Sequence, residues 1–127
     1  MLTFVFWTDV GPKGGGTFLA CDSIAHVARH LRAHPEGVAK QEIPCGARHF
    51  QDFVELTGEA GDVVLLHPFM MHSESRNVSG RPRFLTARIV ELKEPMNFNR
   101  SAAGEHSPVE LAVLRGLGDK RLDFRRA

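Results

Sequence analysis

Two histidines lie at the end of an apolar run in the middle of the chain. His67 directly follows Val63–Leu66, and His72 comes five residues later. Neutral imidazole is the commonest protein ligand for transition metals, and a strand that ends at the mouth of a β-barrel can bring such a ring to an ion in the cavity. His72 is therefore a candidate metal ligand. Strand-end histidines that bond only to backbone groups would show the same spacing, so this alternative stays open.

Two His-X-Glu triplets raise the question of a carboxylate ligand beside the imidazole. The first, at residues 34–36, contains a proline and follows a helix pattern, which favours a surface turn over a rigid pair of ligands. In the second, at residues 72–74, Glu74 shares a strand face with His72 if the strand continues. A solvated surface position is the preferred interpretation of Glu74.

The segments that would position these residues are mostly β-type. Runs rich in β-branched and aromatic residues are separated by turns rich in glycine, proline and aspartate. Gly14–Gly16 is interpreted as a flexible β-turn, because no GK[ST] sequence follows it as in a phosphate loop. The predicted strands are 2–8, 17–20, a hairpin of 53–56 with 63–66, and 84–92.

Two short helices are predicted. Apolar residues recur at helical spacing over residues 23–34, before a Pro-Glu-Gly stop. The second helix is expected over residues 108–117, because Ser107 fits the N-cap, a proline the first helical position and Glu110 the third. Gly118 is expected to end this helix.

The composition fits one soluble globular domain. Of the 127 residues, 43% are hydrophobic, which at this length suffices for a core without disulfides or a structural metal. The net charge of +1 would not draw the chain to nucleic acid or to a membrane surface, and no apolar stretch reaches the ~18 residues of a membrane span. The N-terminus lacks a signal-peptide pattern, so a cytoplasmic location is expected. Cys21 and Cys45 are expected as reduced, buried thiols, with a disulfide between them as the alternative.

One ordered set of residues is similar to the pattern of a known family. The residues that carry the resemblance are, in chain order, Trp7, Gly15-Gly16-Thr17, Gly61-Asp62, His72, Asn77 and Arg83. They follow the order seen in phytanoyl-CoA dioxygenase-like proteins, which are iron(II) and 2-oxoglutarate enzymes. The resemblance spans residues 3 to about 92, and its most specific part is His72 with Arg83 eleven positions later.

The resemblance implies roles for three residues. His72 would be the distal ligand of an iron(II) ion. Arg83 would pair with the far carboxylate of 2-oxoglutarate, because the planar guanidinium grips a carboxylate with two hydrogen bonds. Trp7 would line the same pocket. The implied function is a 2-oxoglutarate-dependent dioxygenase that hydroxylates a small organic substrate.

The resemblance also implies a mainly β fold, a double-stranded β-helix (jelly-roll) fragment with two short helices. On this interpretation residues 1–94 form the β-helix core without its N-terminal strands, and residues 95–127 form a C-terminal extension with one helix. Family members carry a His-X-Asp motif on the strand before the one that matches residues 2–8, so two iron ligands are expected to be missing here. The apolar run of residues 2–7 would then face an open sheet edge, which would invite a homo-oligomer.

A non-catalytic β-barrel that binds a small molecule is the alternative function. The run Gly61, Pro68, His72 and Asn77 comes close to the second motif of cupins, but it misses by one residue at the proline and the asparagine. A cupin would also carry an upstream His-X-His, which the chain lacks. The two functions differ in one requirement, because a dioxygenase needs Arg83 directed into a pocket that contains His72.

Overall fold

The computed structural model describes residues 1–101 and 103–125, and it forms two compact units. Each unit is discontinuous in sequence: Met1–Cys21 with Asp52–Glu91, and Asp22–Gln51 with Leu92–Ala127. The first unit contains the strands and the second contains the helices. The sequence suggested a linear division near residue 94. The grouping differs from it because the first helix packs with the second helix, far along the chain.

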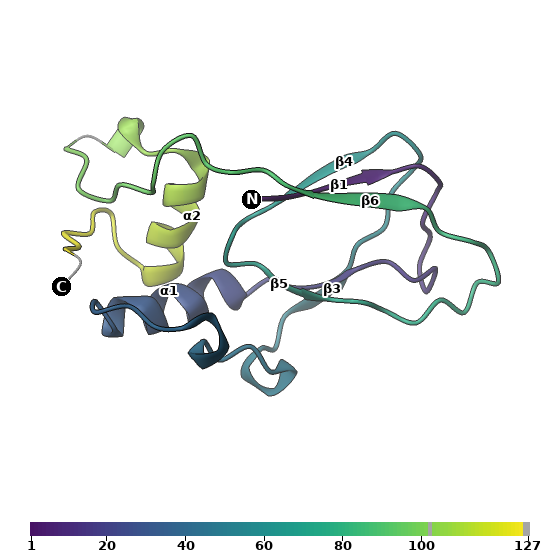
Figure 1. The fold of residues 1–127 in the computed structure, drawn as a ribbon, viewed down its shortest axis with the longest axis horizontal. Coiled ribbons are helices and arrows are strands. Elements are labelled where there is room, and N and C mark those ends of the chain that lie inside the picture. The colour runs from purple at the N-terminus through teal and green to yellow at the C-terminus, as the bar shows by residue number, and fades with distance from the viewer. Residues whose placement is uncertain (102, 126–127) are drawn as a thin grey trace. The chain divides into compact units, whose positions relative to one another are not determined.

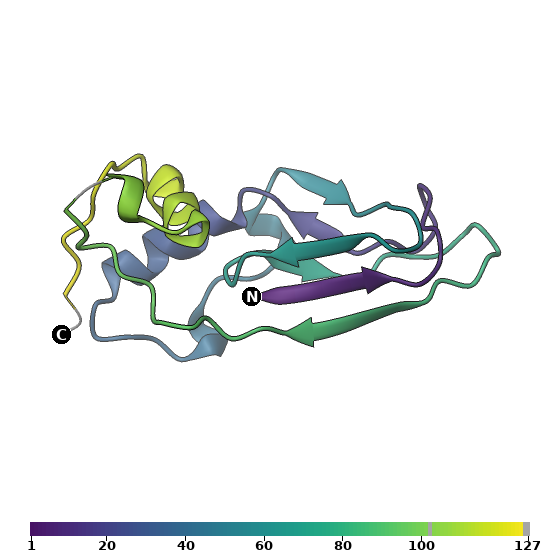
Figure 2. The same cartoon turned by 90° about the horizontal axis from the view of Figure 1, so that it is seen from above.

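The first unit contains two antiparallel three-stranded sheets, which lie opposite one another in Figure 1 and in Figure 2. One sheet has the strand order β4-β1-β6 and the other has the order β3-β2-β5. The strands are β1 (Leu2–Phe6), β2 (Phe18–Ala20), β3 (Phe53–Glu55), β4 (Val63–Leu66), β5 (Met71–Ser73) and β6 (Leu85–Ile89). The fold of the chain is thus mainly antiparallel β with two helices, as the sequence predicted.

Alternation along β1 decides which side chains face the space between the sheets. Phe4 and Phe6 are 5% and 1% exposed, whereas Trp7 is 62% exposed. Phe4 clusters with Leu66 of β4 and with Leu19 of the other sheet, and these three form a buried apolar cluster between the sheets. The even residues of β1 therefore line the inner face, and the odd residues line the outer face.

The predicted hairpin of 53–56 with 63–66 is wrong. β3 pairs with β2, whereas β4 pairs with β1, so the two strands belong to different sheets. The turn between them, with Gly61 at a φ of 99°, carries the chain from one sheet to the other. A sequence pattern locates such a turn, but burial against distant strands decides which strands pair.

Glu55 of β3 holds the glycine-rich loop after β1 in place. Its Oε2 accepts a hydrogen bond from the backbone N–H of Lys13 at 2.8 Å, and its Oε1 accepts one from Gly16 at 3.2 Å. Gly15 has a φ of 82°, which favours glycine. A Cβ at residue 16 would overlap the carbonyl oxygen of Leu56. The loop is therefore packed too closely against the chain after β3 to accept a side chain there.

The second unit is built around two helices that pack against one another. They are α1 (Ser23–Ala33) and α2 (Pro108–Leu117), close to the predicted ranges (Figure 1). A Cβ on Gly116 would lie 2.9 Å from the Cα of Ala25, so the two helices approach closely at this point. Within the described ranges, no helix is long and apolar enough to cross a membrane. Short 3₁₀ turns lie at Lys40–Glu42, Ala47–His49 and Ala103–Glu105.

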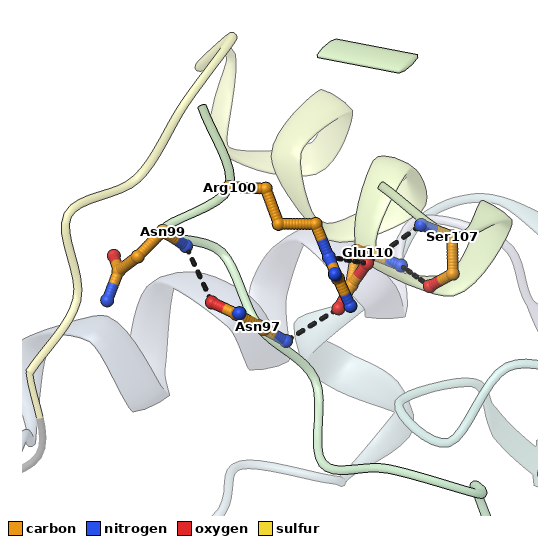
Figure 3. Close-up of polar contacts among 5 residues, drawn as sticks. All are labelled: Asn97, Asn99, Arg100, Ser107 and Glu110. Carbon is orange, nitrogen blue, oxygen red and sulfur yellow. Dashed lines mark hydrogen bonds and ion pairs between the residues drawn. The ribbon is translucent and has the colours of Figure 1, made fainter. Parts of the chain in front are cut away.

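The N-terminus of α2 is capped as the sequence predicted. Ser107 Oγ accepts a hydrogen bond from the Glu110 N–H at 3.3 Å, Glu110 Oε2 accepts one from the Ser107 N–H at 2.7 Å, and Gly118 ends the helix at a φ of 76°. Glu110 also accepts from the Asn97 N–H at 2.6 Å and pairs with Arg100 at 3.4 Å (Figure 3). Burial by itself raises the pKa of Glu110, but the hydrogen bonds from Asn97, Ser107 and Arg100 lower it to about 2.

Cys21 and Cys45 form no disulfide with one another, so both remain thiols. Cys21 is half-buried and Cys45 is exposed, and the predicted burial of Cys45 is therefore wrong. Cys45 lies between Pro44 and Gly46 in a connection without regular structure. Such connections run over the surface, because water then satisfies their backbone groups.

Candidate functional site

His72 lies on β5, on the side of its sheet that faces the other sheet. It pairs with the buried Leu19 of β2, and its ring meets the ring of Phe4 edge-on, with centroids 6.2 Å apart. His72 Nδ1 lies 3.1 Å from the carbonyl oxygen of Met70. Because a carbonyl only accepts, Nδ1 is the donor in this contact, and in the neutral ring the lone pair is then on Nε2. A backbone acceptor on one ring nitrogen is the usual support for a histidine that binds a metal through the other.

Arg83 stands just before β6, on the inner side of its sheet. Leu85 pairs with the buried Phe6, and strand alternation gives Arg83 the same side as Leu85. The Phe84 N–H donates to Thr8 Oγ1 at 3.0 Å, which fixes the chain here beside the end of β1. Arg83 is half-buried and lines a pocket of about 420 Å³.

The pocket at Arg83 lies where the loop after β1 meets the loop between β5 and β6. Gly14 and Asn77 form a β-bridge between the two loops, and the Val78 N–H donates to the carbonyl oxygen of Lys13 at 2.9 Å. The two walls of the pocket are thus joined by backbone hydrogen bonds. The lining residues are Asp9, Gly11, Gly14, Ser79, Arg81, Pro82 and Arg83.

The charge in this pocket is mainly positive. Arg81 and Arg83 contribute two guanidinium groups, and Asp9 contributes one carboxylate. Neither arginine forms an ion pair within the part of the chain that the structure describes. Asp9 Oδ1 accepts a hydrogen bond from the Ala60 N–H at 2.8 Å. Two guanidinium groups without a carboxylate partner in one concave site suit an anionic ligand.

Trp7 lies on the other side of the sheet. Its Nε1 donates to Thr86 Oγ1 at 3.3 Å, and Thr86 pairs with Val5, on the opposite face of β1 from Phe4. The indole is largely exposed on this outer face. Its position gives no support to the expected contact of Trp7 with a cofactor beside Arg83.

His72 and Arg83 belong to different sheets, on the faces that lie opposite one another. The lining of the pocket at Arg83 does not include His72. The described structure thus gives both side chains an inward direction but does not bring them into one pocket. A dicarboxylate between them would have to span the distance from the pocket to the end of β5.

A complete metal centre is not formed by the described residues. Residues 1–101 and 103–125 contain no group of three histidine, cysteine, aspartate or glutamate side chains that could hold a metal ion. Glu74 is exposed, in line with the surface position expected for it. His67 Nδ1 accepts a hydrogen bond from the Phe69 N–H at 3.0 Å, so the backbone-bonded alternative describes this histidine. His72 is left as a single candidate ligand.

Sequence reasoning gave no role in a site to Arg81 and Asp9 of the pocket or to Glu55, which supports the loop. Arg81 stands two residues before Arg83, and a strand-type alternation extended backward would have given both arginines one face. Asp9 carries no such signal, because it reaches the pocket through the path of a loop. Comparison of the chain with known proteins finds no matching family model, curated protein or solved structure.

Proposed function

We propose that this chain is part of an iron(II)/2-oxoglutarate-dependent dioxygenase that hydroxylates a small organic substrate. The observation that carries the proposal is Arg83, a half-buried guanidinium that lines a pocket and has no ion-pair partner among the described residues. Such a group has its paired N–H donors available for a carboxylate. 2-Oxoglutarate is a dicarboxylate of a size that the pocket can hold.

His72 supports the same proposal from the facing sheet. Nδ1 donates to the carbonyl oxygen of Met70, so the neutral ring has its lone pair on Nε2, and this tautomer suits a metal ligand. In this proposal His72 is one of the three protein ligands of iron, and Arg83 holds the far carboxylate of the co-substrate. The earlier expectation for Trp7 is not carried forward, since the indole lies on the outer face of the sheet.

The proposed fold is part of a double-stranded β-helix. A jelly roll has eight antiparallel strands in two facing sheets, with a chain that crosses repeatedly between the sheets. Here the chain runs from β1 to the other sheet for β2 and β3, returns for β4, crosses for β5 and returns for β6. One further strand on each sheet would complete that arrangement. The strand order thus supports the jelly roll over a simple pair of meanders.

The iron site is incomplete in the described residues, so the roles of this chain are limited to binding and orientation. When bound by a full ligand set, iron(II) supplies the reaction of dioxygen with 2-oxoglutarate and a C–H bond, which yields succinate, carbon dioxide and an alcohol. The part of His72 is to present Nε2 in a fixed direction. The part of Arg83 is to hold one end of 2-oxoglutarate, so that the keto acid end points away from the pocket.

Binding of 2-oxoglutarate tests the proposal directly, with the fluorescence of Trp7 as the signal. The chain has one tryptophan and no tyrosine. The backbone N–H of Trp7 donates to the carbonyl oxygen of Phe84, which is the residue after Arg83. We expect saturable binding that falls at least about tenfold in Arg83→Ala, the loss typical of a charged bidentate contact. Arg88→Ala is the matched control, because Arg88 is an exposed arginine on the outer face of β6, the strand that follows Arg83.

Metal binding tests the second part of the proposal. With His72 as the single candidate ligand, Mn²⁺ as a stand-in for iron(II) should bind weakly and broaden the backbone NMR signals of β5, and His72→Ala should abolish this broadening. Unchanged 2-oxoglutarate affinity in Arg83→Ala would refute the dioxygenase. Retained 2-oxoglutarate binding without any effect of Mn²⁺ at His72 would favour the alternative function, a non-catalytic binding protein. One observation already favours this alternative, since His72 does not line the pocket.

A further inference from the structure

The pocket at Arg83 contains a second arginine to which the proposed function assigns no task. Arg81 and Arg83 both line the pocket, and neither has an ion-pair partner within the described residues. With the Asp9 carboxylate, the lining carries two positive charges and one negative charge, a net charge of +1. The one carboxylate offsets only one of the two like charges, so an anion in this pocket relieves the remaining repulsion and gains two donors.

The loop that carries the two arginines is held by its own hydrogen bonds. Asn77 Nδ2 donates to the carbonyl oxygen of Arg81 at 2.7 Å, and Asn77 Oδ1 accepts from the Ser79 N–H at 3.0 Å. The Arg81 N–H donates to Ser79 Oγ at 3.1 Å. Arg81 thus takes part in the loop through its backbone, and its guanidinium is not used by the loop. A binding group on a preformed support loses less entropy when a ligand arrives.

We propose that Arg81 and Arg83 form one anion-binding pair, and that the pocket selects small anions with two negative charges over anions with one. Arg83 supplies the inner guanidinium and Arg81 the outer one, since Arg83 is half-buried and Arg81 is exposed. The negative charge of Asp9 opposes the binding of any anion, so the preference for two charges comes from the two guanidinium groups. The inference rests on the proposed function only in one point, namely that Arg83 binds a carboxylate group of the ligand.

Two sources of a doubly charged anion share this chemistry, a dicarboxylate and a phosphate group. A dicarboxylate places its two charges at separate carbon atoms, so each carboxylate can meet one guanidinium. A phosphate places both charges on one group, which must lie between the two arginines. The separation of the charges in the ligand therefore distinguishes the sources in one binding experiment.

The test is a titration of metal-free protein with glutarate, inorganic phosphate and butyrate at equal ionic strength. Backbone amide NMR signals of Gly11, Gly14 and Ser79 report on the pocket itself. We expect glutarate or phosphate to bind at least about tenfold more tightly than butyrate, because a second charge meets the second guanidinium. Tight glutarate with weak phosphate identifies the dicarboxylate as the ligand class, and the reverse identifies the phosphate.

Four variants separate the contributions of individual side chains to anion binding. Arg81→Ala should reduce the preference for two charges to about the level of butyrate, and it keeps the backbone bonds that hold the loop. Arg81→Lys should restore part of the preference, since it restores the charge. Asp9→Asn keeps an oxygen for the Ala60 N–H and should raise the affinity for all three anions, with a larger gain for the doubly charged ones than for butyrate. Arg88→Ala should change none of these values.

The outcomes also distinguish this inference from the proposed function. Equal affinities in Arg81→Ala and Arg88→Ala, with a loss in Arg83→Ala, would overturn the anion pair and leave Arg83 as the ligand of 2-oxoglutarate. Butyrate binding as tight as glutarate and phosphate would overturn the selection of two charges. Intact selection by Arg81 and Arg83, with no effect of metal at His72, would support the pair and refute the dioxygenase.

Discussion

The imidazole of His72 stands edge-on to the ring of Phe4, with the centroids 6.2 Å apart and the planes at 80°. The two residues come from different sheets, so this contact is one of the places where the sheets meet. The carbonyl oxygen of Met70 holds the same ring by accepting a hydrogen bond from Nδ1. The direction of Nε2 is therefore set before any ligand arrives, which is the condition for a useful metal ligand.

His72 is exposed and is therefore not a core residue, which leads to a prediction about the free energy of unfolding. We expect His72→Ala to lower the free energy of unfolding by less than about 1 kcal/mol, because the ring is exposed and makes one edge contact. Its strand neighbour Leu19 is 8% exposed and belongs to the core cluster, so Leu19→Ala should cost about 2–5 kcal/mol. Denaturant unfolding of both variants checks this. A loss from His72→Ala as large as that from Leu19→Ala would make His72 a core residue.

The glycine-rich loop gives a prediction with a control from the same loop. Gly16→Ala places a Cβ against the carbonyl oxygen of Leu56, which is backbone and cannot move aside easily. We expect a loss of about 1–3 kcal/mol in the free energy of unfolding, the range for overpacked sites. Gly11 has open space at the Cβ position, so Gly11→Ala should stay within about 0.5 kcal/mol of the parent. Equal losses in the two variants would contradict the packing of this loop.

The capping box of α2 gives a third prediction. Ser107→Ala removes the oxygen that accepts from the Glu110 N–H, and the cost should be ~1 kcal/mol in the free energy of unfolding. Ser101 is an exposed serine in the same unit, and Ser101→Ala should have little effect. Thermal unfolding followed by the helical circular dichroism signal measures both. An unchanged melting temperature in Ser107→Ala would count against the cap.

The accuracy of the sequence-based predictions depends on the range of the interactions. The helix over 108–117 was predicted with its cap because Ser107, Glu110 and Gly118 act within a few residues of one another. The hairpin of 53–56 with 63–66 was wrong because a turn pattern does not say which distant strand buries the apolar face of each partner.

The same distinction applies to the candidate site. His72 and Arg83 were selected from a motif, and strand alternation gives both an inward side. Trp7 was selected from the same motif, yet its indole lies on the outer face beside Thr86, because one residue of register reverses the side. Asp9 reaches the pocket only through the path of a loop, and no period in the sequence encodes that path.

Glu110 gives a pH-dependent prediction. Its pKa in the folded chain is about 2 against an ordinary value of 4.5, so the folded state favours the charged carboxylate. The resulting stability, about 3 kcal/mol for that difference, is fully present above pH 4.5 and is lost as the pH falls toward 2. Glu110→Gln keeps the shape but not the charge, so its deficit should be largest near neutral pH and should shrink below pH 4.5.

Denaturant unfolding of the parent and of Glu110→Gln at several pH values measures this deficit. Glu94→Gln is the control, because Glu94 is exposed in the same unit. A deficit for Glu110→Gln that stays constant between neutral pH and pH 3 would contradict the role of the charged carboxylate with Arg100 and the two backbone N–H groups.

The last prediction concerns the edge strand β6. The open edge expected along residues 2–7 is wrong, because β1 is the central strand of its sheet and pairs with both β4 and β6. β6 pairs with β1 on one side only, and its Ile89 is 82% exposed. An unpaired edge with an exposed apolar side chain can pair with the edge of a second chain, so we expect concentration-dependent self-association of the protein in solution. Ile89→Lys should weaken this association at least about tenfold, since a charge at the edge must be desolvated when two edges pair. Sedimentation velocity over a range of protein concentrations measures the effect.

Ser101→Lys is the control for this prediction, because it adds the same charge in the other unit and should leave the association unchanged. An equal effect of both variants would assign the loss of association to net charge and not to β6. A parent protein that sediments as a monomer up to its solubility limit would show that the β6 edge does not pair.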